Sequence, residues 1–186
     1  MVDTEALYRI GDTAEEAGNY ALALQSFERG AALGDISCLF RLALAYDVGG
    51  LGVAVDKNRA MQFYKRAWRR GDWWAAPNNI AILYRERGNL RTMFQWFNRA
   101  AAKGDGSAHL DLAKCYLEGT GVRRNTQSAL RCLAFAIGSE HISEAEREEA
   151  QALLRPCALG ASRVRFRPIA DISSLAIRPW HVPETT

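Results

Sequence analysis

Hydrophobic and small residues recur along this chain with a period of 33 to 37 residues. A five-residue seam of large apolar, small, two variable and aromatic residues occurs as "LALAY" at 42–46, "IAILY" at 80–84 and "LAKCY" at 112–116. A degenerate copy, "IGDTA", stands at 10–14. Gly-Asp pairs begin at 34, 71 and 104, which are 37 and 33 residues apart. Such periods are typical of stacked helical hairpins.

Each repeat is predicted to contain two helices, here called helix A and helix B. The seam belongs to helix A, where residues four apart, such as Leu42 and Tyr46, share one face. The small residue of the seam allows a neighbouring helix to approach closely. Helix B carries small or apolar residues at steps of four and three, as at Ala60, Tyr64 and Ala67. These steps follow one helical stripe, so we expect helices A and B to pack as hairpins.

Polar residues and glycines predict where the helices begin and end. The short polar residues before helix B are Asn19, Asp56, Asn89 and Asn125, and the glycines after it are Gly34, Gly71 and Gly104. Asparagine and aspartate side chains accept the free backbone N–H groups of a first helical turn. Glycine adopts the left-handed conformation that ends many helices. We expect the aspartate after each of these glycines to cap the next helix A.

Two segments carry a family resemblance. "AYDVGGLGVAVDKNRAMQFYKRAWRRGD" (45–72) and "CYLEGTGVRRNTQSALRCLAFAIGS" (115–139) resemble the Sel1-like repeat family, in which a Gly-x-Gly-Val loop follows the seam. Residues 3–35 and 73–105 have "EAGN" (16–19) and "ERGN" (86–89) instead of that loop, and are similar to tetratricopeptide repeats. In the last repeat Gly138 comes two residues early and Glu140 stands where glycine is expected, so we expect its end to differ.

The resemblance implies an all-α fold, a right-handed α/α superhelical solenoid of about four helical-hairpin repeats. The repeats are expected at about 3–35, 36–72, 73–105 and 106–140, within a single domain of residues 1–155. A capping helix at about 143–155 is predicted to begin with the capping-box pair Ser143 and Glu146. Residues 156–186 contain prolines and many large apolar side chains, and are predicted to form an extended, irregular tail docked on the solenoid.

The resemblance also implies that the concave side, lined by helix A, binds a protein or peptide. The predicted groove residues lie at fixed offsets from each seam, and are Tyr8, Asp12, Phe40, Leu44, Asn78, Ile82, Arg85, Leu110 and Lys114. The groove is expected to be apolar at its centre and acidic at its N-terminal end. The alternative is that Phe40, Leu44 and Ile82 fill the core of a tight superhelix.

Candidate residues for catalysis or metal binding do not form known patterns. The three histidines lie in separate segments, and "GGLG" (49–52) is not followed by the Lys-Ser/Thr of a phosphate-binding loop. Cys38, Cys115 and Cys132 lie among apolar residues without Cys-x-x-Cys spacing and are predicted to be buried thiols. We therefore predict a protein that is not an enzyme, with no cofactor and no metal.

Composition and charge change this picture in two ways. The 186 residues are 48% hydrophobic, with neither an apolar run near 18 residues nor a leader pattern, so we expect a cytoplasmic bacterial protein with no membrane partner. The net charge of +3 conceals an acidic start, −5 over residues 1–35, and a basic middle, +7 over residues 36–105. The basic segment 65–74, with Lys65, Arg66, Arg69, Arg70 and tryptophans, is a candidate for nucleic-acid binding.

Three functional hypotheses follow. The leading one is a non-enzymatic protein–protein interaction module, an adaptor or regulator that uses the concave groove. An alternative is an immunity protein that neutralises a cognate toxin acting in the bacterial cytoplasm. Nucleic-acid binding through residues 65–74 is the less favoured alternative, because that segment lies on helix B and the overall charge is small. The sequence does not choose between adaptor and immunity protein.

Overall fold

The computed structural model describes residues 3–71 and 75–160, with side chains described as far as residue 155. All regular secondary structure in these residues is helical. The helices are α1 (Thr4–Glu16), α2 (Tyr20–Leu33), α3 (Ile36–Val48), α4 (Lys57–Gly71), α5 (Ala76–Glu86), α6 (Leu90–Ala101), α7 (Gly106–Glu118), α8 (Thr126–Gly138) and α9 (Glu144–Gly160). Helix A of the four repeats is α1, α3, α5 and α7, and helix B is α2, α4, α6 and α8.

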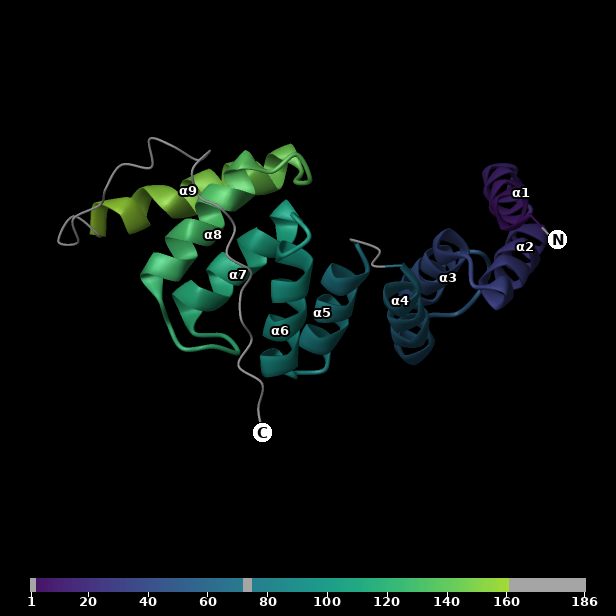
Figure 1. The fold of residues 1–186 in the computed structure, drawn as a ribbon, viewed down its shortest axis with the longest axis horizontal. Coiled ribbons are helices and arrows are strands. Elements are labelled where there is room, and N and C mark those ends of the chain that lie inside the picture. The colour runs from purple at the N-terminus through teal and green to yellow at the C-terminus, as the bar shows by residue number, and fades with distance from the viewer. Residues whose placement is uncertain (1–2, 72–74, 161–186) are drawn as a thin grey trace.

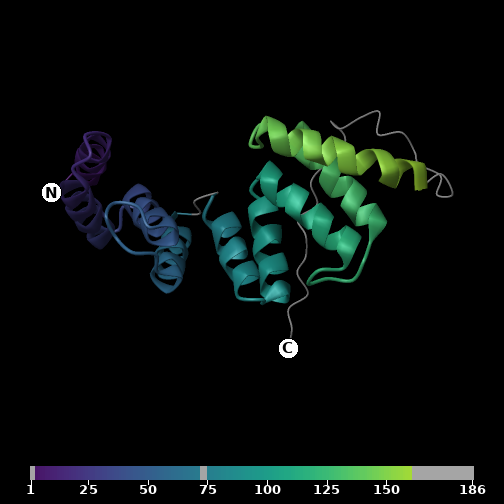
Figure 2. The same ribbon diagram turned by 180° about the vertical axis from the view of Figure 1, so that it is seen from behind.

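The helices form four consecutive hairpins stacked into an elongated, curved array. Each helix packs on the next along the chain, from α1 on α2 to α8 on α9. Figure 1 shows the first hairpin at one end and α9 closing the other, and Figure 2 shows the same order from behind. The predicted all-α solenoid is confirmed.

Small residues bring the two helices of a hairpin close together. A Cβ atom placed on Gly11 of α1 would lie 2.6 Å from the Phe27 ring of α2, so no side chain fits there. The corresponding Ala43, Ala81 and Ala113 of the later seams are fully buried. The small residue of the seam therefore marks where helix A contacts helix B.

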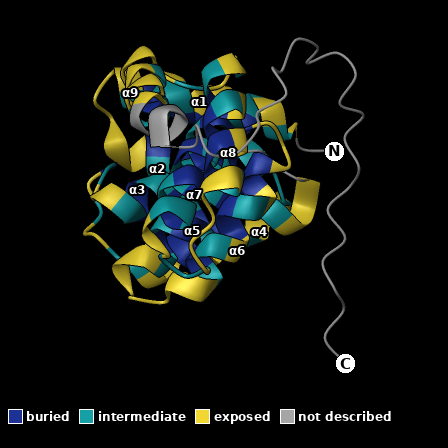
Figure 3. Ribbon diagram, turned by 90° about the vertical axis from the view of Figure 1, so that its left-hand side faces the viewer, coloured by how far each residue is buried: buried dark blue, intermediate teal, exposed yellow. Residues whose placement is uncertain are grey.

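The core follows the predicted stripe of helix B. Phe27, Tyr64, Phe97 and Leu133 occupy equivalent positions and are at most 1% exposed. Burying each of these side chains stabilises the fold by roughly 1.5–3 kcal/mol. Figure 3, seen along the length of the array, shows the buried residues gathered inside and the exposed ones around them.

One backbone hydrogen bond closes all four hairpins. The N–H of the residue that caps helix B donates to the carbonyl of the last seam residue in helix A. These bonds run from Asn19 to Ala14 (2.8 Å), Asp56 to Tyr46 (2.8 Å), Asn89 to Tyr84 (3.0 Å) and Asn125 to Tyr116 (2.9 Å). The bond is the same in hairpins with short and with glycine-rich loops, because only the residues between its ends differ.

The predicted caps of helix B are all present. Side-chain oxygens of Asn19, Asn89 and Asn125 accept from backbone N–H groups three residues ahead, at 3.2, 3.2 and 3.0 Å. Asp56 accepts from two N–H groups, each at 3.0 Å. Asp35 and Asp105 cap α3 and α7 in the same way.

The junction between the second and third repeats differs from the prediction. Gly71 is the last residue of α4 and does not have a positive φ, whereas Gly34 and Gly104 do. Helix α5 has Ala75 as its N-cap, without a side-chain bond, so Asp72 is not its cap and itself lies outside the described residues. The reason is Pro77 in the first turn, where its fixed φ favours a helix start and its missing N–H costs nothing.

The capping helix begins as predicted but ends later. Ser143 N–H donates to Glu146 Oε2 at 3.1 Å, and Glu146 N–H donates to Ser143 Oγ at 3.3 Å, which together make a capping box. The helix continues to Gly160 instead of ending at residue 155. The expected boundary at Pro156 was wrong because proline removes one helical hydrogen bond without necessarily ending the helix. Predictions for residues 161–186 lie outside the described residues.

Candidate partner-binding surface

The predicted groove residues differ in how far they are buried. Half-buried are Tyr8, Asp12, Phe40, Leu44, Asn78, Ile82 and Lys114; Arg85 is exposed, and Leu110 is buried. Leu110 is only 2% exposed and belongs to the same core cluster as Leu133 and Ala150 of α8 and α9. The prediction for Leu110 was therefore wrong, because α9 closes the array at the fourth repeat and removes that position from the surface.

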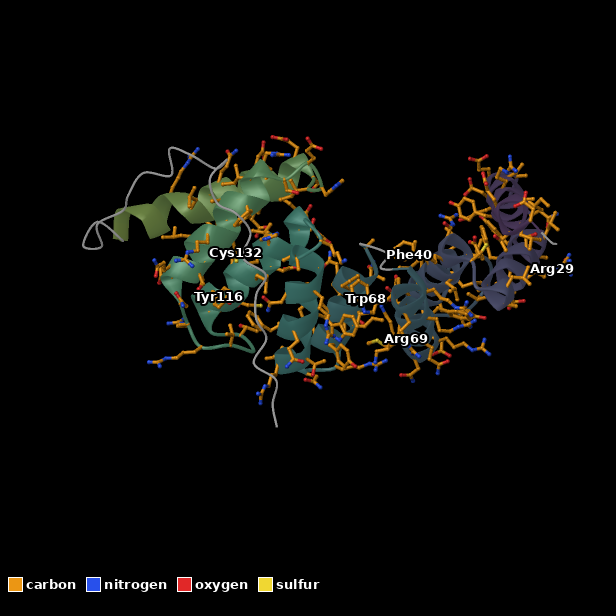
Figure 4. All side chains as sticks on the ribbon, in the orientation of Figure 1. Arg29, Phe40, Trp68, Arg69, Tyr116 and Cys132 are labelled. Atoms are coloured by element: carbon orange, nitrogen blue, oxygen red, sulfur yellow. The ribbon has the colours of Figure 1, made fainter. Side chains whose placement is uncertain are left out.

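The apolar centre of the concave side is part core and part surface. The Phe40 ring lies 5.5 Å from the Tyr64 ring, centroid to centroid, and Tyr8 lies 5.9 Å from Phe27. Leu44 and Ile82 pack against the central core cluster. Each of these four residues still keeps part of its side chain accessible. In Figure 4, Phe40 lies toward the upper edge of the array and Arg69 toward the lower edge.

Ion pairs connect helix A of one repeat to the next. Arg41 of α3 contacts Glu15 of α1 and lies 3.8 Å from Asp12. Arg85 Nη1 of α5 lies 3.6 Å from Asp111 Oδ1 of α7. The Arg41 guanidinium stands between two carboxylates and so compensates part of the acidic charge at the N-terminal end of the surface. Partly exposed pairs of this kind contribute roughly 0–1 kcal/mol each.

The fourth repeat makes the same kind of link to the capping helix. Lys114 Nζ lies 2.8 Å from Glu149 Oε1 of α9. Burial raises the pKa of Asp111 on the same helix, and the nearby Arg85 and Lys114 cations act in the opposite direction. The concave side thus carries alternating charges that are already paired within the protein.

Asn78 is the exception among the polar groove residues. Its Oδ1 atom is buried and has no hydrogen-bond partner among the described residues. Buried polar atoms are nearly always paired, and an unpaired acceptor costs roughly 1–3 kcal/mol. A donor supplied from outside the chain would remove that cost.

Sequence reasoning missed Arg41, Asp111 and Glu149. Arg41 and Asp111 both stand one residue before the seam, and each pairs with the residue five positions beyond the start of the preceding seam, Glu15 and Arg85. Comparing charges between these two registers in neighbouring repeats would have found both pairs.

The basic segment is largely engaged within the protein. Lys65 Nζ donates to Tyr84 Oη at 2.9 Å, Arg66 Nη2 to Ala31 O at 3.1 Å and Arg69 Nε to Lys65 O at 3.2 Å. Trp68 is half-buried, and its ring meets the Trp96 ring edge-on at 6.2 Å. Trp73 and Trp74 lie outside the described residues. Neither described tryptophan offers an open ring face for a stacked base.

Reactive groups are absent from the described part of this surface. Burial raises the pKa of the Cys38 and Cys115 thiols to about 12 and that of Cys132 to about 11, so these thiols stay protonated. Among the side chains of residues 3–71 and 75–155, no three His, Cys, Asp or Glu groups converge to hold a metal ion. In the same ranges, no helix has the length and apolar character needed to cross a membrane.

Comparison with known proteins identifies the repeats. The Sel1 repeat family model matches residues 36–72, 94–105 and 106–137. These stretches of the chain are therefore similar to Sel1 repeats, an α/α class whose members generally mediate protein–protein interactions and are typically non-catalytic scaffolds. The unmatched stretches include the first hairpin and residues 73–93 of the third, the two hairpins with short loops. No curated protein sequence matches the chain.

Solved structures show the same fold at low identity. A protective antigen of uropathogenic Escherichia coli, with an SLR fold, has a TM-score of 0.65 at 18% identity, over 91% of this chain and 50% of its own. A Sel1 repeat protein from Oxalobacter formigenes has a TM-score of 0.69 at 22% identity, and the match covers 90% of this chain and 67% of that protein. The MamA protein has a TM-score of 0.54 at 15% identity, and the match covers 88% of this chain and 96% of MamA. The chain spans half the length of the E. coli antigen.

Proposed function

We propose that the protein is a non-enzymatic adaptor or regulator that binds a partner protein or peptide through its concave helix-A surface. The observation that carries this proposal is the row of half-buried side chains at equivalent positions of three repeats. Tyr8 and Phe40 stand two residues before their seams, and Leu44 and Ile82 two residues after the start of theirs. A partner that lies along the array contacts side chains at the same positions, relative to the seam, in several repeats.

The chemistry of the surface suits a polypeptide partner. Aromatic and aliphatic side chains that are already held by the core lose little conformational freedom when a partner covers them. Buried aromatic anchors carry much of the binding energy at protein interfaces. The rim is charged, with Arg85 exposed at its edge. An apolar centre with a polar rim is the usual anatomy of such an interface.

A groove variant and a matched control test the proposal. A partner is first captured from the source lysate with the whole chain, and its affinity is measured by calorimetry. Leu44→Gln with Ile82→Gln should weaken binding at least about tenfold, which corresponds to 1.4 kcal/mol. Leu33→Gln with Leu90→Gln changes two exposed apolar residues of helix B and should leave affinity within about twofold.

Circular dichroism shows whether Leu44 and Ile82 act as groove residues or as core residues. If the groove variant melts like the wild type and still binds with unchanged affinity, the proposal is wrong. If it loses its helical signal, Leu44 and Ile82 are core residues, and the alternative interpretation of the sequence holds. Should the partner be a toxin, rescue of growth on co-expression and nanomolar affinity would favour the immunity role over the adaptor role.

A further inference from the structure

The outer face of helix B repeats two residues in the same register in three consecutive repeats. Glutamine stands six residues after the N-cap of helix B, and arginine stands ten residues after it. These residues are Gln25 and Arg29, Gln62 and Arg66, and Gln95 and Arg99. All six are exposed. We call this set the outer ladder.

Each glutamine–arginine pair of the outer ladder is called a rung, and the three rungs lie on helix B of three consecutive repeats. Within each helix the glutamine and arginine are four residues apart, so they share one face. Arg66 Nη2 donates to Ala31 O of α2 at 3.1 Å, and the Trp68 and Trp96 rings join α4 to α6. Successive rungs are therefore linked by these side-chain contacts. Figure 4 shows Arg29 on α2 and Trp68 on α4 along this part of the array.

Two of the three arginines are held in a fixed orientation by an aromatic ring. The Arg66 guanidinium lies 5.6 Å from the Phe63 ring centroid, and the Arg99 guanidinium lies 4.3 Å from that of Trp96. In both cases the ring belongs to the residue three positions earlier. Stacking leaves the N–H edges of a guanidinium available for carboxylate or phosphate oxygens.

The ladder arginines have no acidic partner within the described residues. No carboxylate lies within 4.0 Å of Arg29, Arg66 or Arg99, whereas Arg41 and Arg85 on the concave side are both paired. Helices α4, α6 and α8 contain no aspartate or glutamate at all. Helix α2 carries one acidic residue, Glu28, so the three ladder helices together carry more positive than negative charge.

We propose that the outer ladder is a second docking surface, which binds an extended acidic segment of a partner protein. A polyproline II chain rises about 3.1 Å per residue with three residues per turn, so every third side chain faces the same way at about 9 Å spacing. The three arginines stand on three different helices, so a segment whose acidic residues are separated in this way can place carboxylates on successive arginines. The glutamines hydrogen-bond the peptide backbone between them.

A nucleic acid fits this surface less well. DNA carries a charge about every 1.7 Å, far denser than a ladder with one arginine on each of three helices. The Phe63 and Trp96 rings are covered by guanidinium groups, so they are not free to stack on bases. The outer ladder also lies on the opposite side of the array from the concave residues, so its partner and the groove partner can bind independently.

Fluorescence anisotropy with a labelled peptide tests this inference. The probe is (Glu-Pro-Ala)4, compared with a peptide of the same composition whose four glutamates are contiguous, at about 50 mM salt so that screening stays weak. The ladder variant is Arg29→Gln/Arg66→Gln/Arg99→Gln. The control, Arg9→Gln/Arg123→Gln/Arg155→Gln, removes the same charge from exposed positions elsewhere. A double variant, Arg29→Gln/Arg99→Gln, keeps the Arg66 bond to Ala31 in case the triple variant unfolds.

The proposal expects the spaced peptide to bind the wild type more tightly than the contiguous one. The ladder variant should lose at least about tenfold in affinity, because three ion pairs with the peptide are removed together, and the control should lose less than about threefold. Equal losses in both variants, no binding of the spaced peptide, or tighter binding of a twelve-nucleotide single-stranded DNA at the same arginines would each overturn it.

Discussion

Gly11 is the position where the first hairpin tolerates no side chain. The Phe27 ring occupies the space that a Cβ atom would need, and Phe27 is fully buried. Gly11→Ala should therefore lower the free energy of unfolding by about 1–3 kcal/mol, as overpacking of a core does. The measurement is urea denaturation followed by circular dichroism.

The matched control for this prediction is Gly138→Ala. Gly138 ends α8, has no atom within 4 Å of an added Cβ and does not have a positive φ. Alanine there should be neutral or stabilising by up to about 1 kcal/mol, because alanine favours helix more than glycine does. If both variants unfold at the same urea concentration as the wild type, the close contact at Gly11 is not important for stability.

His109 should make stability depend on pH. Its Nδ1 lies 2.9 Å from the Asp105 carbonyl oxygen and its ring stacks on Phe135. Burial lowers the pKa of His109 below its ordinary value of 6.5, although Asp105 acts in the opposite direction. The folded state thus binds a proton at His109 less readily than the unfolded state does. The contribution of neutral His109 to the free energy of unfolding is therefore present above about pH 6.5 and is lost as pH falls through the folded pKa.

Urea unfolding between pH 7.5 and pH 5 measures this dependence. The wild type should lose stability toward pH 5, and His109→Gln should lose less over the same range. An NMR titration of the His109 imidazole gives the pKa directly. A value above 6.5 in the folded protein would contradict the prediction.

At the scale of single elements, α9 depends on its capping box. Ser143→Ala removes the oxygen that accepts from Glu146 N–H and should cost about 1 kcal/mol, most of it within α9. Hydrogen exchange of the α9 amides should accelerate accordingly, while that of the α3 amides should not change. Thr126→Ala, an exposed residue in the first turn of α8 with Asn125 still as its cap, is the comparison. Equal acceleration of α9 by both variants would show that the cap is not the cause.

At the scale of the whole molecule, the two ends of the array differ. The first hairpin has one neighbour and leaves Ile10 and Leu22 exposed, at 47% and 41%. At the other end α9 packs on α8 and buries Ala150 completely. Terminal repeats without a cap are the least stable part of a repeat array.

We therefore expect the array to open from α1. Native-state hydrogen exchange should be fastest in α1 and α2 and slowest in α5 and α6, which contribute half of the buried residues of the central core cluster. Uniform exchange across all helices would instead indicate that the array unfolds as one cooperative unit.

Much of the fold could be predicted because the same residue pattern recurs in each repeat. The cap residues, the small seam residues and the buried stripe of helix B depend on contacts within one hairpin, where helical spacing alone fixes which side chains meet. Asn19, Ala43 and Phe97 all lie as the sequence predicted. Local exceptions came from proline, at Pro77 and at Pro156, because its effect depends on which turn of a helix contains it.

The sequence by itself determined the helices, their pairing and the family resemblance, since all three follow from a periodic pattern of residue types. Which concave residues reach the surface was decided only by the tertiary structure. Phe40 and Leu110 occupy the same register, yet one is half-buried and the other is enclosed by the cluster that includes α9. Arg41 likewise finds Glu15 only when two repeats are stacked. Exposure and charge pairing depend on the neighbouring repeat, which a pattern within one repeat does not contain.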